Sequence, residues 1–172
     1  KELKRLAKDA MSAVMNWIDT YYPHLAKDRV SERSVSFKDP LFPTLSMYGK
    51  IDLTERFPDG AITVTDFKTG GVKTPGMIEK LTEDHRLSDY MRQLAMYSYL
   101  IRGAEKGSVV TSSRLLFVEA DKKEKNALYE TRISEEQIDL LVRDIQEYDE
   151  ALKSGEWVHR ECHHKGYGDK VE

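Results

Sequence analysis

The stretch that decides the fold is Gly49-Lys50-Ile51-Asp52, followed by Val64-Thr65-Asp66-Phe67-Lys68-Thr69-Gly70. The turn residues Pro58-Asp59-Gly60 lie between two runs of β-forming residues, which predicts an antiparallel hairpin. In a hairpin centred on Asp59, Asp52 and Asp66 lie opposite each other, because both are seven residues from the centre. The sequence therefore predicts two facing carboxylates.

The predicted pair of carboxylates needs a compensating charge. Opposite residues on one face of an antiparallel pair have Cβ atoms roughly 4.5–5.5 Å apart, so Asp52 and Asp66 repel unless a cation or proton lies between them. Lys68 is two residues beyond Asp66, and the strand period places it on the same face. Ile51 and Phe67 are expected to point the other way, into the core.

Two close carboxylates and a lysine suit Mg²⁺-dependent hydrolysis of a phosphodiester. Magnesium prefers a few carboxylate ligands and keeps its other positions for water and phosphate. The ammonium of Lys68 can orient the attacking water or stabilise developing negative charge. The alternative is that Asp66 and Lys68 form an ordinary surface ion pair beside a turn.

The predicted elements around the hairpin run in the order helix, three strands, helix, two strands, helix. They cover residues 3–21, 30–37, 45–57, 61–67, 88–103, 109–119, 127–133 and a last helix after 134. Residues 72–84 are polar and are predicted to carry no element. Ser134 and Gln137 predict a capping box for the last helix, whose core face is Ile138, Leu141, Val142, Ile145, Tyr148 and Leu152.

Composition narrows the functional classes. The chain has 172 residues, which fits one domain, and a formal charge of -3, which excludes DNA binding through bulk positive charge but leaves a local basic groove open. No apolar run approaches the length of a membrane span, and the single cysteine, Cys162, excludes an internal disulfide framework. No Walker-type phosphate-binding motif is present. We expect a cytoplasmic protein.

Three ordered motifs carry a family resemblance: Gly-x-Ile-Asp at 49–52, Asp-Phe-Lys-Thr-Gly at 66–70, and Gln93-x-x-x-Tyr97. Together they resemble the PD-(D/E)xK nuclease superfamily in its RecB-type branch, which includes the nuclease domains of the RecB, AddA and AddB helicase-nucleases and the CRISPR-associated RecB-like exonucleases. The resemblance implies an α/β fold with a restriction-endonuclease-like αβββαβ core, a central mixed sheet flanked by helices. It also implies that residues 1–172 are a single nuclease domain from the C-terminal part of a longer helicase-nuclease, and the start at Lys1 agrees with an excised domain.

The resemblance also implies site residues. Asp52 and Asp66 would be ligands of Mg²⁺ or Mn²⁺, with the backbone carbonyl of Phe67 completing the site, and Lys68 would be the catalytic lysine. Gln93 and Tyr97 are four residues apart on one helical face, where they would meet the metal site or the DNA strand. For Tyr97 a core aromatic is an equal alternative.

The sequence departs from the family pattern in its first helix, which lacks the usual metal-binding histidine. His24 follows that helix and is either an additional metal ligand or a surface histidine. Glu32 matches a glutamate on the first strand of the branch, and it is either an accessory site residue or a member of an ion pair.

The tail is a second departure. Cys162-His163-His164-Lys165-Gly166-Tyr167 resembles the Cys-x-x-Cys-x-Tyr segment that holds an iron–sulfur cluster in some relatives, but Lys165 replaces the second cysteine. No iron–sulfur cluster is expected. A zinc site with His159, His163 and His164 or a flexible cationic tail near DNA are the remaining interpretations.

The sequence thus favours a metal-dependent DNA nuclease, an exonuclease of repair or recombination that takes single-stranded ends from helicase domains and needs no membrane. Lys73, Lys80, Arg86 and Arg92 either contact phosphates or are solvated charges. The main alternative is a catalytically weak or inactive nuclease-like module that binds DNA. A different enzyme with carboxylates on a hairpin is a third possibility, in which Gln93 has no role.

Overall fold

The computed structural model describes residues 2–118 and 127–155, so the cysteine–histidine motif of the tail lies outside the described residues. The elements are α1 (Glu2–Thr20), a 3-10 helix η1 (Tyr22–His24), β1 (Asp28–Phe37), β2 (Met47–Arg56), β3 (Ile62–Lys68), α2 (Pro75–Glu79), α3 (Asp89–Ala104), β4 (Val110–Phe117), β5 (Leu128–Thr131) and α4 (Glu135–Ser154). The predicted order is confirmed, with η1 and α2 as additions.

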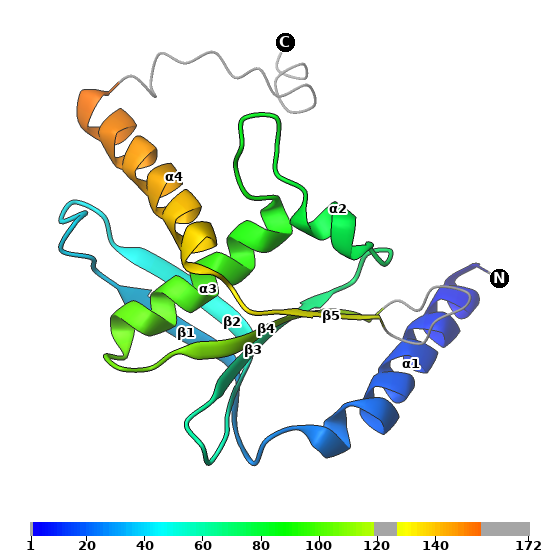
Figure 1. Ribbon diagram of the computed structural model, residues 1–172. Helices are drawn as coiled ribbons and strands as arrows, with labels where there is room; N and C mark the ends of the chain where they lie inside the picture. The colour runs from blue at the N-terminus through cyan, green and yellow to red at the C-terminus, as the bar shows by residue number, and fades with distance from the viewer. Residues whose placement is uncertain (1, 119–126, 156–172) are drawn as a thin grey trace, which may run out of the picture.

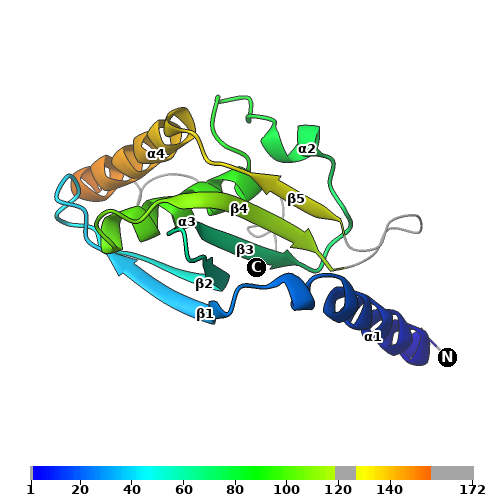
Figure 2. The same ribbon diagram turned by 60° about the horizontal axis from the view of Figure 1, so that its bottom comes forward.

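The five strands form one mixed sheet in the order β1-β2-β3-β4-β5. Strands β3 and β4 are parallel, and the other neighbouring pairs are antiparallel. Helix α3 lies across β1 to β4, and α4 packs on α3 (Figures 1 and 2). The predicted α/β architecture, a mixed sheet with flanking helices, is confirmed.

The core lies between α3 and the sheet. The hydroxyl of Ser88 accepts a hydrogen bond from the N–H of Met91 and so caps the start of α3. Beyond that cap, apolar side chains at helical spacing are fully buried against the strands, including Leu94, Leu100 and Ile101. This packing fixes the rotation of α3, and it directs the polar side chains between them toward β3.

The predicted hairpin register is confirmed. Leu53 pairs with Thr65 and Thr54 with Val64, so the two strands are symmetric about Asp59. The N–H of Phe57 donates to the carbonyl of Ala61 and closes the turn. The ladder ends at the pair Leu53–Thr65, one step before Asp52 and Asp66.

The outer helices differ from the predictions in part. The capping box of Ser134 and Gln137 is confirmed, but Tyr148 of α4 is 60% exposed, so its predicted place in the core is wrong. The buried row of α4 ends at Asp149, the adjacent position, which takes the inward place that Tyr148 was expected to fill. Helix α1 has no buried residue and extends away from the sheet (Figure 1).

Within the described part of the chain, no helix is both long and apolar enough to span a bilayer.

Candidate active site at the end of β3

Asp66 is the centre of a polar cluster that links β3 to α3. Its side chain is buried, and the residue is 3% exposed. The Oδ1 atom accepts hydrogen bonds from Gln93 Nε2 at 2.7 Å and from the Tyr97 hydroxyl at 3.0 Å. Tyr97 is itself 5% exposed, so it is both a core aromatic and a partner of Asp66. The prediction of a core aromatic is confirmed, and the role of Tyr97 at a metal or DNA strand stays a prediction.

Lys68 occupies the other side of Asp66. Its Nζ lies 2.7 Å from Asp66 Oδ2 and donates a hydrogen bond of 2.6 Å to Gln93 Oε1. The predicted shared face of Asp66 and Lys68 is confirmed. Among the described residues, Asp66 Oδ2 has no hydrogen-bond donor in good geometry, so its contact with the lysine is an ion pair rather than an aligned hydrogen bond.

The electrostatics of Asp66 follow from this burial. Desolvation raises the pKa of Asp66 above its ordinary value, the close contact with the Lys68 ammonium opposes that rise, and the nearby charge of Asp52 adds to it. Burial also raises the pKa of Tyr97, so the phenol stays protonated and can donate to the carboxylate. A buried carboxylate is stabilised by a cationic partner, and in this structure the Lys68 ammonium is that partner.

Asp52 lies where β2 and β3 separate. Its Oδ2 accepts a hydrogen bond of 2.8 Å from the backbone N–H of Phe67, the residue after Asp66. The Phe67 ring contacts Trp17 with 5.6 Å between ring centroids, and it is half-buried outside the main core. The prediction that Phe67 points into the core is therefore wrong, because Phe67 packs against Trp17 of α1, a helix with no buried residue. Ile51 is fully buried in the main core, as predicted.

Glu32 lies opposite Asp52 in the β1–β2 register, between the pairs Ser31–Leu53 and Arg33–Ile51. It has a left-handed backbone with φ of 54°, which is unusual for a residue other than glycine. Its exposed carboxylate forms an ion pair with Lys50. Of the two interpretations of Glu32, the ion pair is present.

His24 is exposed at the end of η1. Among the described residues, no group of three or more histidine, cysteine, aspartate or glutamate side chains is placed to hold a metal ion. His24 is thus not brought together with the two aspartates.

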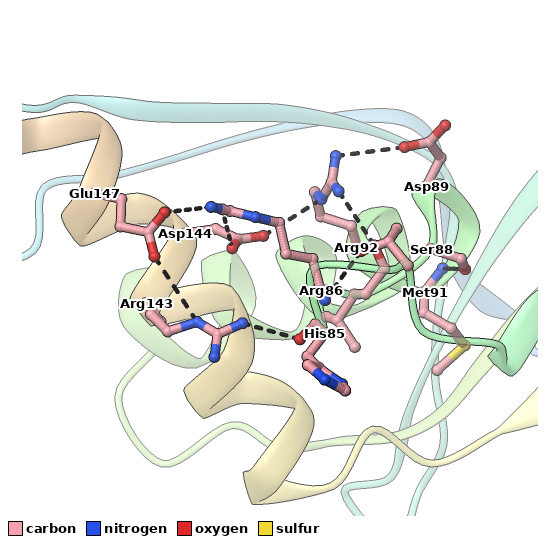
Figure 3. A network of polar contacts seen from close by, with 11 residues as sticks. His85, Arg86, Ser88, Asp89, Met91, Arg92, Arg143, Asp144 and Glu147 are labelled. Atoms are coloured by element: carbon pink, nitrogen blue, oxygen red, sulfur yellow. Dashed lines mark hydrogen bonds and ion pairs between the residues drawn. The ribbon is translucent and has the colours of Figure 1, made fainter. Parts of the chain in front are cut away.

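Arg86 and Arg92 are engaged with α4 rather than free (Figure 3). Arg86 Nη1 lies 2.6 Å from Asp144 Oδ1, and its Nη2 contacts Glu147. Arg92 Nε lies 3.6 Å from the other oxygen of Asp144, and Arg143 donates to the carbonyl of His85 at 2.9 Å. These contacts tie the segment before α3 to α4, so both arginines already have carboxylate partners.

Tyr90 contacts the cluster but was not expected there. Its ring centroid lies 5.6 Å from Lys68 Nζ. The apolar periodicity of α3 places Tyr90 with Leu94 and Tyr97 on the core face. The sequence feature that could have identified Tyr90 is its separation of three residues from Gln93. Residues three apart lie on the same face of a helix, and both side chains contact Lys68.

Comparisons with known proteins identify the family and the fold of this chain. The sequence model of the PD-(D/E)XK nuclease superfamily matches residues 1–164. The crystal structure of a candidate exonuclease from Eubacterium rectale is similar over 87% of this chain and 54% of its own, with a TM-score of 0.54 and 15% identity. The crystal structure of SSO0001 matches over 90% of this chain and 63% of its own, with a TM-score of 0.44 and 15% identity. This chain thus spans roughly half the length of the Eubacterium protein. Among curated proteins none matches.

Proposed function

Because this chain belongs to the PD-(D/E)XK nuclease superfamily, we propose that it hydrolyses phosphodiester bonds of DNA with the help of Mg²⁺ or Mn²⁺. The observation that carries the proposal is the buried Asp66, whose Oδ1 accepts from Gln93 and Tyr97 and whose Oδ2 forms an ion pair with Lys68 without an aligned hydrogen bond. A surface ion pair has no need of such an arrangement.

The residues present fit a divalent metal ion. Asp52 and Asp66 adjoin the last pair of the hairpin, and Asp66 Oδ2 accepts no aligned hydrogen bond from Lys68, so it keeps lone-pair capacity for a divalent ion beside the ammonium. We assign both carboxylates and the backbone carbonyl of Phe67 as its ligands. When bound, the ion supplies Lewis-acid chemistry, since it polarises a phosphoryl oxygen and acidifies water.

The other side chains prepare the site for a phosphate. The Lys68 ammonium provides positive charge beside Asp66, where it stabilises negative charge that develops on the scissile phosphate. Gln93 donates to Asp66 and accepts from Lys68, so one amide fixes both groups. Tyr97 donates a further hydrogen bond and keeps the Asp66 carboxylate from rotating.

The finer assignment is to the RecB-type branch, with exonuclease action on single-stranded ends delivered by helicase domains during repair or recombination. It is supported by the motifs Asp-Phe-Lys-Thr-Gly and Gln-x-x-x-Tyr and by the contacts between them. The net charge of -3 agrees with a narrow channel that accepts a delivered strand.

Cleavage of end-labelled single- and double-stranded DNA tests the activity, with Mg²⁺, Mn²⁺ or EDTA. Asp66→Ala should lower the rate by at least about a hundred-fold, because the carboxylate is expected to bind the metal. Asp149→Ala is the matched control, since Asp149 is also buried but contacts Thr44 and Lys153 on another part of the fold. Metal-dependent cleavage that Asp66→Ala retains would contradict the assignment.

A covalently closed single-stranded circle distinguishes exonuclease from endonuclease action, because an exonuclease needs a free end and leaves the circle intact.

A DNA-binding module without strong catalysis is the second candidate. It is favoured by the lack of a third metal-binding side chain beside the two aspartates among the described residues. Binding of labelled single-stranded DNA by folded protein, without cleavage in either metal, would support it.

A further inference from the structure

The ammonium of Lys68 is enclosed by three groups. Asp66 Oδ2 and Gln93 Oε1 lie at 2.7 and 2.6 Å, and the Tyr90 ring covers a third side with its centroid at 5.6 Å. The ring is within the distance at which an aromatic face attracts a cation. Lys68 therefore has an aromatic partner in addition to its two oxygen partners.

Tyr90 is itself held firmly. Its ring packs edge-on against Phe117 of β4, with 6.1 Å between centroids and an interplanar angle of 64°. Phe117 is fully buried, so it gives the tyrosine a fixed wall. Within the described residues the Tyr90 hydroxyl makes no hydrogen bond, which leaves the ring as the part of Tyr90 that acts on Lys68.

We propose that Tyr90 is a positioning residue, whose ring face holds the Lys68 ammonium in place by a cation–π interaction. The inference rests on the proposed function, because it assigns the purpose of the contact to phosphodiester hydrolysis. A lysine has four flexible carbon–carbon bonds, and two oxygen partners on one side do not fix its direction. The ring adds a third contact and so restricts where the ammonium can move, while the 23% of the Lys68 side chain that stays exposed leaves room for a phosphate.

This role requires the electron-rich face of the ring and not its shape alone. A ring that only filled space would tolerate fluorine, which withdraws electron density and changes the volume little. A hydroxyl-dependent role would not tolerate phenylalanine. Fluorinated rings therefore distinguish the cation–π role from packing, and Tyr90→Phe distinguishes it from a role of the hydroxyl.

The experiment measures kcat and KM for DNA cleavage by the 172-residue chain carrying Tyr90→Phe, Tyr90→Leu, or di- and pentafluorophenylalanine at position 90. Tyr90→Leu should lower kcat about five-fold with little change in KM, and Tyr90→Phe should stay within about two-fold of the wild type. Each added set of fluorines should lower kcat further while the melting temperature stays constant. Tyr99→Leu, a buried tyrosine on the same helix away from Lys68, is the matched control and should keep its kcat.

Equal kcat for phenylalanine and pentafluorophenylalanine would overturn the proposal in favour of packing. Loss of kcat in Tyr90→Phe equal to that in Tyr90→Leu would overturn it in favour of the hydroxyl.

A spectroscopic measurement decides the contact even if the chain does not cleave DNA. Protons on the Lys68 ε-carbon should resonate upfield in the wild type and in Tyr90→Phe, and they should move downfield in Tyr90→Leu when the ring current is removed. The same chemical shift in all three proteins would overturn the inference about Tyr90. Absence of cleavage with the upfield shift present would instead reject the proposed function and, with it, the catalytic purpose of a contact that exists.

Discussion

Burial raises the pKa of four of the described tyrosines, Tyr21, Tyr97, Tyr99 and Tyr129, so the stability of the fold falls at alkaline pH. For Tyr129, desolvation and the 2.8 Å hydrogen bond that it donates to Glu79 raise the pKa to about 12. An unfolded tyrosine ionises near pH 10. Below pH 10 both states keep the proton and the full stabilisation is present. Between about pH 10 and 12 only the unfolded state loses the proton, so the free energy of unfolding falls.

Tyr129→Phe should reduce this alkaline loss of stability, because phenylalanine has no proton to lose. Urea unfolding at pH 9 and pH 11 gives the loss as the difference between two free energies of unfolding. The loss should be smaller in Tyr129→Phe than in the wild type. Tyr148→Phe is the control, since Tyr148 is exposed and its removal should leave the loss unchanged. An equal loss in all three proteins would show that Tyr129 does not hold its proton as inferred.

At the scale of single residues, the two-residue period of a strand was enough to predict that Asp66 and Lys68 lie together in the polar cluster. Asp66 and Lys68 had to share a face because they are two apart in a strand, and their ion pair follows from that rule. Tyr90 was hidden because an aromatic at helical spacing is indistinguishable from a core residue until the partner strand is known. The left-handed backbone of Glu32 was equally hidden, since no glycine or asparagine marks the position.

At the scale of the elements, α3 packs tightly against β1 at Gly103. A Cβ atom at Gly103 would overlap the ring of Phe37, which itself packs against Tyr99 with 5.9 Å between centroids. Gly103→Ala should therefore lower the free energy of unfolding by about 1–3 kcal/mol, although alanine favours the helix by about 1 kcal/mol. Gly76→Ala in α2, where a Cβ meets nothing within 4 Å, should leave the protein as stable or more so. Chemical unfolding of both variants measures the contrast, and equal stability would contradict the close approach.

The contacts of α4 with the segment before α3 form a clamp of measurable strength. Asp144 is largely buried and faces both Arg86 and Arg92 (Figure 3). A double-mutant cycle of Arg86→Ala and Asp144→Ala should give a coupling energy of about 1–3 kcal/mol in unfolding experiments. The exposed pair Arg102–Glu135 is the control, and its coupling should be at most about 0.5 kcal/mol. Equal coupling in the two cycles would mean that the clamp is no stronger than a surface pair.

Element boundaries were predictable where capping or turn residues mark them, as at Ser134 and at Pro58-Asp59-Gly60. Helix α2 was missed because it has five residues, with a glycine inside. Ile78 of α2 is fully buried, which indicates that tertiary packing rather than local helix preference stabilises so short a helix.

At the scale of the whole molecule, the two faces of the sheet are covered unequally. Helix α3, with α4 packed on it, covers one face, whereas α1 extends away from the sheet (Figure 2). Trp17 of α1 contacts Phe67, and the other large apolar side chains of α1 are exposed. Every contact that orders the polar cluster therefore comes from the side of α3. The amphipathic pattern of α1 predicted the helix correctly but could not reveal what its apolar face would meet.

The origin of the cluster in two separate parts of the chain also governs how the protein folds. Asp52 and Asp66 belong to a hairpin with a short turn, which forms on the microsecond scale. The parallel strands β3 and β4 can pair only after the connection that contains α3 has folded back across the sheet. While only the hairpin exists, the Asp66 carboxylate is still hydrated. Its desolvation comes with the docking of α3, so the group on which hydrolysis is proposed to depend also opposes the late, long-range step of folding.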